Sequence, residues 1–155
     1  QRDTGGLTDS HRAARDYYII RASYGAVRRT FGGNKKPIHS SIDRIPQIQE
    51  RLKDVVIENK DFEALIKIYD RPDALLYMDP PYYQAERHYD GFTTNDHDRL
   101  FSCVQKLKGS VILSYNDHPD IRRMYDRFSI TELERPNPLA RKRNSIYREL
   151  IIKNF

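Results

Sequence analysis

The sequence predicts an α/β fold with a mostly parallel sheet, preceded by a helical segment. From residue 55 onward, short apolar runs alternate with stretches of helical periodicity. Some of these runs are continuously apolar, as expected for strands buried on both faces. The first fifty residues contain helical patterns and a glycine-containing loop instead. We therefore expect a helical and loop region at 1–50 and an α/β region at 51–155.

Two helices are expected in the first region. Residues 8–10 are good N-cap types, and the helix that they begin should end near Gly25. Gly, Asn and Pro between residues 28 and 37 mark a loop. The apolar spacing over 45–52 predicts a second, shorter helix.

The second region alternates between strands and helices. The apolar run 55–57 predicts a short strand, and Asp61 can cap the helix after it. The run 74–78 predicts a strand buried on both faces. Two further helices should begin near Thr94 and at Pro119. The remaining strands are expected at 110–115, 130–133 and 147–152, and the last two could pair as a hairpin.

The composition restricts the class of protein. The 155 residues are 38% hydrophobic and 32% charged, too apolar for a disordered chain and too polar for a membrane protein. We expect neither a spanning helix nor a signal peptide. The single cysteine, Cys103, excludes an internal disulfide framework and a cysteine-based zinc cluster, so a reducing cytoplasm is the expected compartment. Because the chain begins with Gln1, we expect a fragment or a processed product.

The positive charge is concentrated in the first region. The chain has a formal net charge of +5, of which residues 1–50 carry +4. A mild basic excess suits a polyanionic partner. The first third of the chain is therefore the part expected to face such a partner, and the rest has the composition of an ordinary globular core.

One tetrapeptide is a candidate site. Residues 79–82 are Asp-Pro-Pro-Tyr and directly follow the apolar run 74–78. In open α/β sheets, ligands bind at the carboxyl ends of strands. A proline turn that only ends the strand is the alternative, but the pattern arises by chance roughly once in 50,000 positions. The placement therefore favours a functional loop.

The chemistry of this loop fits methyl transfer to an exocyclic amino group. The lone pair of the adenine amino nitrogen is delocalised into the ring, which makes it a poor nucleophile. The Asp79 carboxylate and the Pro80 carbonyl can each accept one N–H, which favours a tetrahedral nitrogen and stabilises developing positive charge. The fixed φ angles of Pro80 and Pro81 hold that carbonyl still. Tyr82 can stack on a base swung out of the duplex. No metal is needed.

Five further segments accompany the Asp-Pro-Pro-Tyr motif. They are an aromatic-rich helix at 12–25, a strand and helix start at 51–62, a loop and helix at 89–97, a strand end at 113–117 and a closing strand at 148–154. Together with the motif, they resemble the C-terminal part of the Dam-like class of DNA adenine methyltransferases, which use S-adenosylmethionine (SAM). The resemblance covers about residues 10–155, in the family's order.

The resemblance implies roles for individual residues. SAM would be the methyl donor and double-stranded DNA the partner, in the cytoplasm and at a bacterial or phage nucleoid. Asp79 would contact both the target amine and the methionine part of SAM, and Asp61 and Phe62 would flank its adenine. Residues 1–50 would be the DNA-recognition insertion. The candidate DNA contacts are Arg21, Tyr24, Arg28, Arg29, Asn34, Lys35, Lys36, Arg141, Lys142 and Arg143.

Some elements of the resembling family are not found in the sequence. Its members begin with a Gly-Gly-Lys element, followed by a strand with a glycine-rich loop for SAM and a strand ending in an acid for the ribose. Residues 30–35 imitate the glycine-rich loop, but they follow Arg28 and Arg29 rather than an apolar strand. We therefore expect a partial SAM-methyltransferase sheet of Rossmann-like type that lacks these strands. The strand at 55–57 would then have an unpaired edge, and the chain alone should be a poor methyltransferase.

Several alternatives remain open at this point. The chain could be a non-catalytic DNA-binding remnant, or one half of an enzyme that needs a missing N-terminal segment or a second chain. The same chemistry could also act on cytosine amino groups or on RNA. Asn116 and Asp117 could line the site or cap the helix at Pro119, and His97 is expected on a helix surface.

Overall fold

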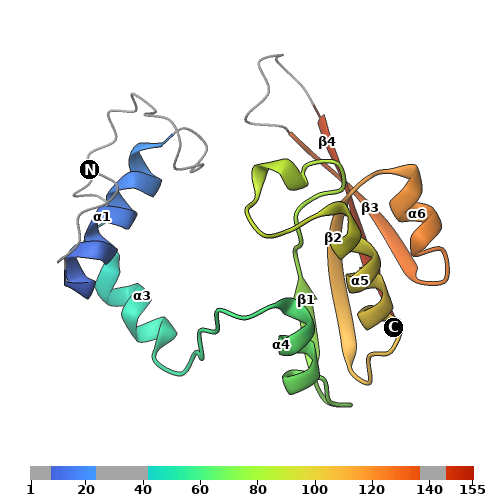
Figure 1. The fold of residues 1–155 in the computed structure, drawn as a ribbon, viewed down its shortest axis with the longest axis horizontal. Helices are drawn as coiled ribbons and strands as arrows, with labels where there is room; N and C mark the ends of the chain where they lie inside the picture. The colour runs from blue at the N-terminus through green and yellow to red at the C-terminus, as the bar shows by residue number, and fades with distance from the viewer. Residues whose placement is uncertain (1–7, 24–41, 137–145) are drawn as a thin grey trace. The chain divides into compact units, whose positions relative to one another are not determined.

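The computed structural model describes residues 8–23, 42–136 and 146–155 (Figure 1). The chain divides into two compact units, Gln1–Ile57 and Glu58–Phe155. We describe each unit by itself. The candidate DNA contacts Tyr24, Arg28, Arg29, Asn34, Lys35, Lys36, Arg141, Lys142 and Arg143 lie outside the described residues.

The described part of the first unit contains both predicted helices. Helix α1 covers Asp9–Ala22, and the Thr8 side chain caps it by accepting a hydrogen bond from the backbone N–H of His11. Helix α3 covers Ile45–Leu52 and has a proline in its first turn. Neither helix contains a buried residue.

The second unit contains a four-stranded sheet with the order β1-β2-β4-β3. Strands β1 (Leu75–Met78) and β2 (Ser110–Asn116) are parallel. Strand β4 (Ile146–Lys153) is antiparallel to β2 and to β3 (Ser129–Pro136), so the predicted hairpin is confirmed. The prediction of a mostly parallel sheet was wrong, because β4 lies between β2 and β3 and runs against both.

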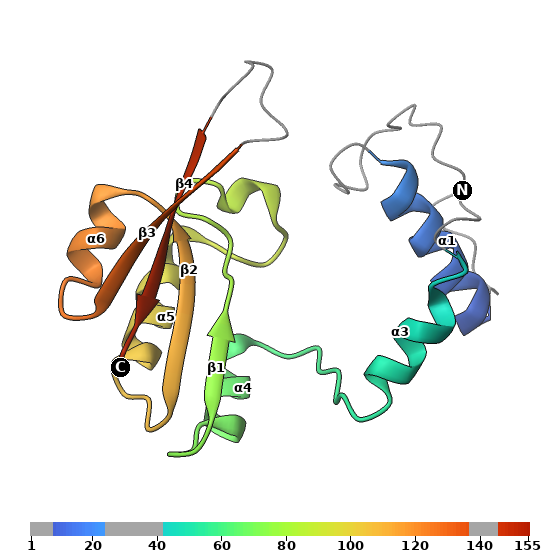
Figure 2. The ribbon, with the colours of Figure 1, turned by 180° about the vertical axis from the view of Figure 1, so that it is seen from behind.

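The described helices of this unit cover one face of the sheet. They are α4 (Phe62–Tyr69), α5 (Thr94–Val104) and α6 (Pro119–Met124), and a short 3₁₀ helix, η2 (Glu86–His88), precedes α5. Figure 2 shows β1 and β2 in front of α4 and α5. The core lies between these layers. Its side chains with less than 1% exposure are Val111, Leu113, Tyr115, Ile121, Tyr125, Leu150 and Ile152.

Strand β1 is only half buried. Leu76 and Met78 pack against the core, whereas Leu75 and Tyr77 are 61% and 66% exposed. The prediction that this strand is buried on both faces was therefore wrong. The physical reason is its place at the sheet edge, where the described helices cover only one face.

The apolar run 55–57 does not form the predicted strand. Residues 55–57 belong to no helix or strand, and Val56 and Ile57 are 75% and 78% exposed. The Val55 N–H donates to the carbonyl of Leu52 at the end of α3 rather than to a strand. An apolar run becomes a strand only when it pairs with a partner, and none of the described strands pairs with this one.

A close-packed turn fixes β1 against β2. The Asp70 carboxylate, at the end of α4, accepts hydrogen bonds from the backbone N–H groups of Lys108 and Gly109, each at 3.0 Å. A Cβ on Gly109 would lie 2.5 Å from the carbonyl oxygen of Arg71 and 2.6 Å from that of Ala74. Only glycine fits at position 109, because the backbone there lies so close to the backbone of residues 71–74.

Candidate functional site

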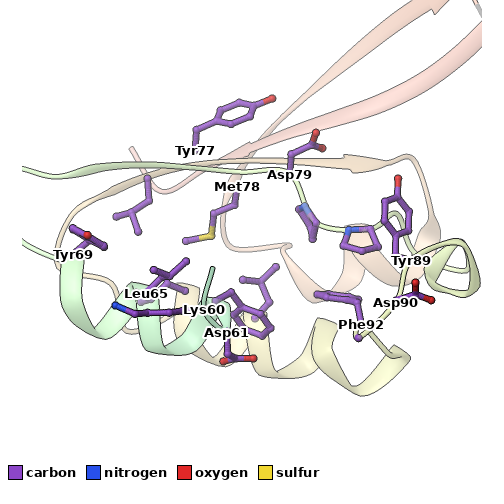
Figure 3. Close-up of a pocket in the computed structure, with 17 residues that line it drawn as sticks. Lys60, Asp61, Leu65, Tyr69, Tyr77, Met78, Asp79, Tyr89, Asp90 and Phe92 are labelled. Carbon is purple, nitrogen blue, oxygen red and sulfur yellow. The ribbon is translucent and has the colours of Figure 1, made fainter. Parts of the chain in front are cut away.

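The Asp-Pro-Pro-Tyr loop begins where β1 ends, as the sequence predicts. It borders a pocket of about 600 Å³ between β1, the start of α4 and the loop before α5. Figure 3 shows Met78 pointing toward Leu65 of α4, whereas Tyr77 and Asp79 project from the opposite side of the chain. The pocket therefore has an apolar base. Asp79 lines it where β1 ends, with its carboxylate on the side of the chain away from Leu65.

Strand β2 holds the catalytic candidate Asp79. The Ser114 hydroxyl donates a hydrogen bond of 2.8 Å to Oδ1 of Asp79. Ser114 is only 4% exposed, and it follows Leu113, which the parallel register pairs with Met78. One carboxylate oxygen is thus fixed by the protein, and a second oxygen can accept from a ligand.

The residue after the motif is clamped by the same strand. Oδ1 of Asn116 accepts the Tyr83 N–H at 2.9 Å, and Nδ2 of Asn116 donates to the Tyr83 carbonyl at 3.2 Å. The Tyr83 ring lies between His97 and His118, with centroid distances of 5.2 and 4.8 Å. Ser114 and Asn116, two residues apart on β2, therefore hold the two ends of the loop 79–83.

The interpretation of Asn116 or Asp117 as the cap of α6 was wrong, because His118 caps that helix. Asn116 binds the loop, whereas Asp117 pairs with Arg122 at 2.6 Å. The cap of α6 is His118, whose Nδ1 accepts from the Asp120 N–H. The hydrogen bonds from Arg122 hold the pKa of Asp117 below its usual value.

Tyr82 is attached to the hairpin β3–β4. Its hydroxyl donates a hydrogen bond of 2.7 Å to Oε1 of Glu149, which is 5% exposed and also pairs with Arg135. The Tyr147 ring is tilted against Tyr82 with a centroid distance of 6.2 Å. Burial, together with the carboxylate of Glu149, raises the pKa of the Tyr82 phenol, so it remains a donor at neutral pH.

His97 is buried rather than on the helix surface, which corrects the sequence prediction. It is 1% exposed, and its Nδ1 and Nε2 lie 2.7 Å from the Tyr115 hydroxyl and 2.6 Å from Oε1 of Glu86. Burial opposes ionisation of Glu86, but hydrogen bonds from backbone N–H groups and from His97 outweigh it and lower its pKa. These contacts join η2 to α5 and β2. The spacing of His97, Leu100 and Val104 on one helical face is the signal that could have found it.

The start of α4 also borders the pocket. Asp61 caps this helix, as predicted, because its Oδ1 accepts the backbone N–H of Glu63 at 3.0 Å. Asp61 and Phe62 both line the pocket. Arg99 of α5 contacts both residues: Nη2 is 3.1 Å from Oδ1 of Asp61, and the guanidinium carbon is 4.8 Å from the Phe62 ring centroid.

The described residues include one of the candidate DNA contacts. Arg21 lies in the last turn of α1 and is exposed; it is the one candidate DNA contact within the described ranges. Within those ranges, no group of three or more His, Cys, Asp or Glu side chains could hold a metal ion. The helices of the same ranges are all too short or too polar to cross a membrane.

The Asp-Pro-Pro-Tyr loop lies at the end of a strand in an α/β sheet. The family model of D12 class N6 adenine-specific DNA methyltransferases matches residues 17–136. The chain belongs to this family, which confirms the resemblance predicted from the sequence.

A curated relative agrees with this membership. The chain is 28% identical over 86 residues to the Type II methyltransferase M.CviBI of Paramecium bursaria Chlorella virus NC1A. The aligned part is 54% of this chain and 33% of the viral protein. The chain thus spans about a third of that relative's length.

Proposed function

We propose that this chain is the base-holding part of a methyltransferase that modifies the exocyclic amino nitrogen of adenine in double-stranded DNA, with SAM as methyl donor. The observation that carries the proposal is the Asp79 carboxylate, fixed at the end of β1 by the 2.8 Å hydrogen bond from Ser114. Family membership supports the reaction class.

The loop residues have distinct tasks in this proposal. SAM, when bound, supplies an electrophilic methyl group. A free oxygen of Asp79 and the carbonyl of Pro80 each accept one N–H of the flipped base, so the nitrogen lone pair turns away from the ring and toward the methyl group. Pro81 restricts the backbone after that carbonyl. Tyr82 stacks on the extruded base while its hydroxyl stays bonded to Glu149.

The pocket beside the loop fits SAM in its size and in its lining. It holds about 600 Å³, and Leu65, Met78 and the aromatic ring of Phe62 line it. Asp61 and Asp79 also line it. An aromatic ring and an apolar floor suit a nucleoside, the Asp61 carboxylate suits the N–H groups of its purine, and the Asp79 carboxylate suits the cationic sulfonium and ammonium groups. We therefore assign Asp61, Phe62 and Asp79 to cofactor binding.

DNA recognition belongs to the first region in this proposal. Residues 1–50 carry +4 of the net charge, and Arg21 ends α1 on an exposed surface. Basic side chains there would contact phosphates, so DNA affinity should fall steeply with salt. Such a protein works at the nucleoid of a bacterium or a phage-infected cell.

We also propose that the sheet is completed by a segment outside this chain or by a second chain. One edge of β1 is unpaired among the described residues, and Leu75 and Tyr77 are exposed beside it. The apolar residues 55–57 belong to no described strand, and Val56 and Ile57 are exposed as well. These exposed groups also favour the second candidate function, a half-protein that holds DNA but needs its complement for turnover. Little methyl transfer is expected from the chain alone.

The test is methylation of DNA adenine by the complete protein carrying Asp79→Ala. We expect transfer to be abolished and most DNA affinity to remain, because the carboxylate acts on the amine rather than on the phosphates. Asp73→Ala, an exposed carboxylate before the same strand, is the matched control. Normal turnover of the Asp79→Ala protein would refute the assigned role, and methylated cytosine in place of methylated adenine would change the substrate.

A further inference from the structure

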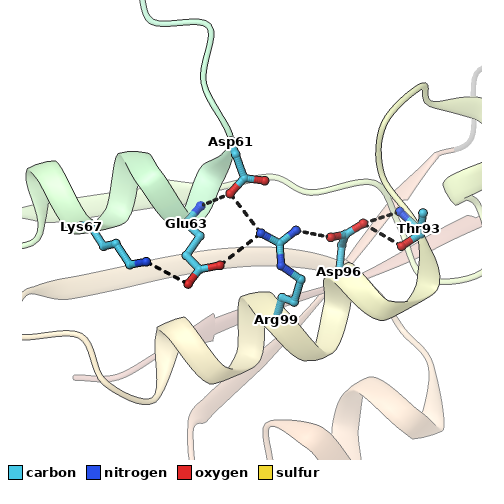
Figure 4. A network of polar contacts seen from close by, with 6 residues as sticks. All are labelled: Asp61, Glu63, Lys67, Thr93, Asp96 and Arg99. Carbon is cyan, nitrogen blue, oxygen red and sulfur yellow. Dashed lines mark hydrogen bonds and ion pairs between the residues drawn. The ribbon is translucent and has the colours of Figure 1, made fainter.

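Arg99 of α5 connects two helices and contacts Asp61 and Phe62, which line the pocket. Nη2 lies 3.1 Å from Oδ1 of Asp61 and 3.1 Å from Oε2 of Glu63, both at the start of α4. Nη1 lies 2.5 Å from Oδ1 of Asp96, in the first turn of α5 itself (Figure 4). One guanidinium thus bridges three carboxylates from two helices, a geometry for which its fixed fork is suited.

The guanidinium is itself held in place. Oδ2 of Asp96 accepts the backbone N–H and the hydroxyl of Thr93 at 2.7 and 2.8 Å, and Asp96 is only 7% exposed. Lys67 pairs with Glu63 at 3.2 Å from the other side. The carboxylates that bind Arg99 are therefore themselves held by other residues, and the position of the Arg99 side chain does not depend on a ligand.

Arg99 determines which oxygen of Asp61 can meet a ligand. The backbone N–H of Glu63 and Nη2 of Arg99 both bind Oδ1 of Asp61. Both of these contacts use Oδ1, and none of the described residues forms a hydrogen bond or ion pair with Oδ2 of Asp61. Asp61 is half exposed and lines the pocket. Its Oδ2 is therefore an acceptor for an N–H donor of the ligand.

Arg99 also fixes the aromatic wall. Its guanidinium carbon is 4.8 Å from the Phe62 ring centroid, within the range of a cation–π contact. Phe92 is tilted against the same ring at 6.1 Å. With these two neighbours, Phe62 cannot rotate freely, and it presents a defined side to the pocket that it lines.

We propose that Arg99 is a positioning residue for the purine end of the bound cofactor. By holding Oδ1 of Asp61 and the ring of Phe62, it leaves Oδ2 to accept an N–H of the purine amino group and sets the ring that contacts the base. The inference rests on the proposed function, which places SAM in this pocket. It assigns no contact between Arg99 and the ligand.

The test is calorimetric titration of two nucleosides into the 155-residue chain. Adenosine has the exocyclic amino group, and purine riboside lacks it. The wild-type chain should bind adenosine about three- to tenfold more tightly, the effect of one hydrogen bond. Arg99→Met should weaken adenosine binding by about that factor and bring the ratio of the two affinities close to one. Arg99→Lys keeps the charge but not the fork, so we expect an intermediate ratio.

The ratio of the adenosine affinity to the purine riboside affinity distinguishes a positioning role of Arg99 from a purely structural one. If Arg99 only joined α4 to α5, its loss would weaken both nucleosides equally and leave the ratio unchanged. Arg122→Met is the matched control, because Arg122 also bridges two carboxylates, Asp117 and Glu132, away from this pocket. It should keep the wild-type ratio.

Two outcomes would overturn the inference. One is a wild-type ratio in the Arg99→Met chain. The other is no adenosine binding by a wild-type chain whose circular dichroism and cooperative unfolding show that it is folded. Either result leaves the proposed function standing if Asp79→Ala still abolishes methylation in the complete protein, so the two proposals fail separately.

Discussion

The Tyr82 hydroxyl and Oε1 of Glu149 are joined by a hydrogen bond of 2.7 Å, although the two residues are 67 positions apart in the sequence. Tyr82 belongs to the loop after β1, and Glu149 lies on β4, on the far side of β2. The bond therefore attaches the aromatic side chain of the motif to the hairpin β3–β4. Arg135 of β3 pairs with the same carboxylate, so both strands of the hairpin take part.

Removal of the Glu149 carboxylate should destabilise the fold. Glu149→Ala leaves the half-buried hydroxyl of Tyr82 without its acceptor, which we expect to cost about 1–3 kcal/mol in free energy of unfolding. Glu149→Gln keeps an acceptor oxygen and should recover most of that loss. Urea denaturation measures all three proteins. Glu134→Ala, from an exposed pair with Arg148, is the control and should change stability by less than about 0.5 kcal/mol.

The Ser114 hydroxyl should affect turnover more than binding. Ser114→Ala removes the hydrogen bond that orients Asp79, while the carboxylate itself stays. We expect kcat of the complete protein to fall by about three- to tenfold, the effect of one hydrogen bond, with little change in KM for DNA. Steady-state methylation kinetics measures both constants. Ser110→Ala, at the other end of β2, is the control; an equal loss of kcat in both variants would contradict the orienting role.

The sequence predicted the helices of this chain better than its sheet. The start of α1 at Thr8 and of α4 at Asp61 could be predicted because a cap is a local signal. The run 55–57 and the strand β1 have equally apolar sequences, yet one is unpaired and the other lies at an edge with Tyr77 exposed. Strand formation and burial depend on partners far away in the sequence, which an apolar run does not specify.

Contacts between distant elements were also the part of the candidate site that the sequence did not predict. The loop at Asp79 was predictable, because an unusual motif directly follows an apolar run. Its supporting residues were not: Ser114 meets Asp79 only through the parallel register of β1 and β2, and Glu149 meets Tyr82 only because β4 lies beside β2. Such pairs join separate elements and leave no local pattern. Whether the candidate residues bind SAM and DNA stays a prediction.

The stability of the second unit should decrease in acid. Hydrogen bonds from Thr93 and Arg99 hold the pKa of Asp96 below the usual 3.8. A carboxyl with a lowered folded-state pKa stabilises the fold above the unfolded-state pKa, and this stabilisation is lost as the pH falls through the folded-state value. The free energy of unfolding should therefore decline from about pH 4 downward.

Asp96→Asn tests this dependence. The amide keeps an acceptor for Thr93 but does not titrate, so the acid slope of the unfolding free energy should be shallower than in the wild-type chain. Urea denaturation between pH 7 and pH 2.5 measures the slope. The exposed Asp73, at 85% side-chain exposure, provides the control, and Asp73→Asn should keep the wild-type slope. Parallel curves for the wild-type and Asp96→Asn chains would contradict the prediction.

Gly109 should tolerate no side chain, although its backbone has an ordinary φ. A Cβ there would lie 2.5 and 2.6 Å from the carbonyl oxygens of Arg71 and Ala74, and backbone atoms cannot move aside as a flexible side chain can. We expect Gly109→Ala to cost about 1–3 kcal/mol in free energy of unfolding. Lys108→Ala is the control, because it keeps the backbone N–H that binds Asp70.

Gly109→Ala should also affect the candidate site, because it would disturb the register of β1 and β2. The turn at Gly109 starts β2, and the pairing of β1 with β2 brings Ser114 to Asp79. A shift of that turn would lengthen the Ser114–Asp79 hydrogen bond, so Gly109→Ala should lower methyl transfer at temperatures where the variant is still folded. Thermal unfolding and methylation kinetics of the complete protein measure the two effects. A Gly109→Ala protein with wild-type stability would show that the turn can relax, and the argument from close packing would then be wrong.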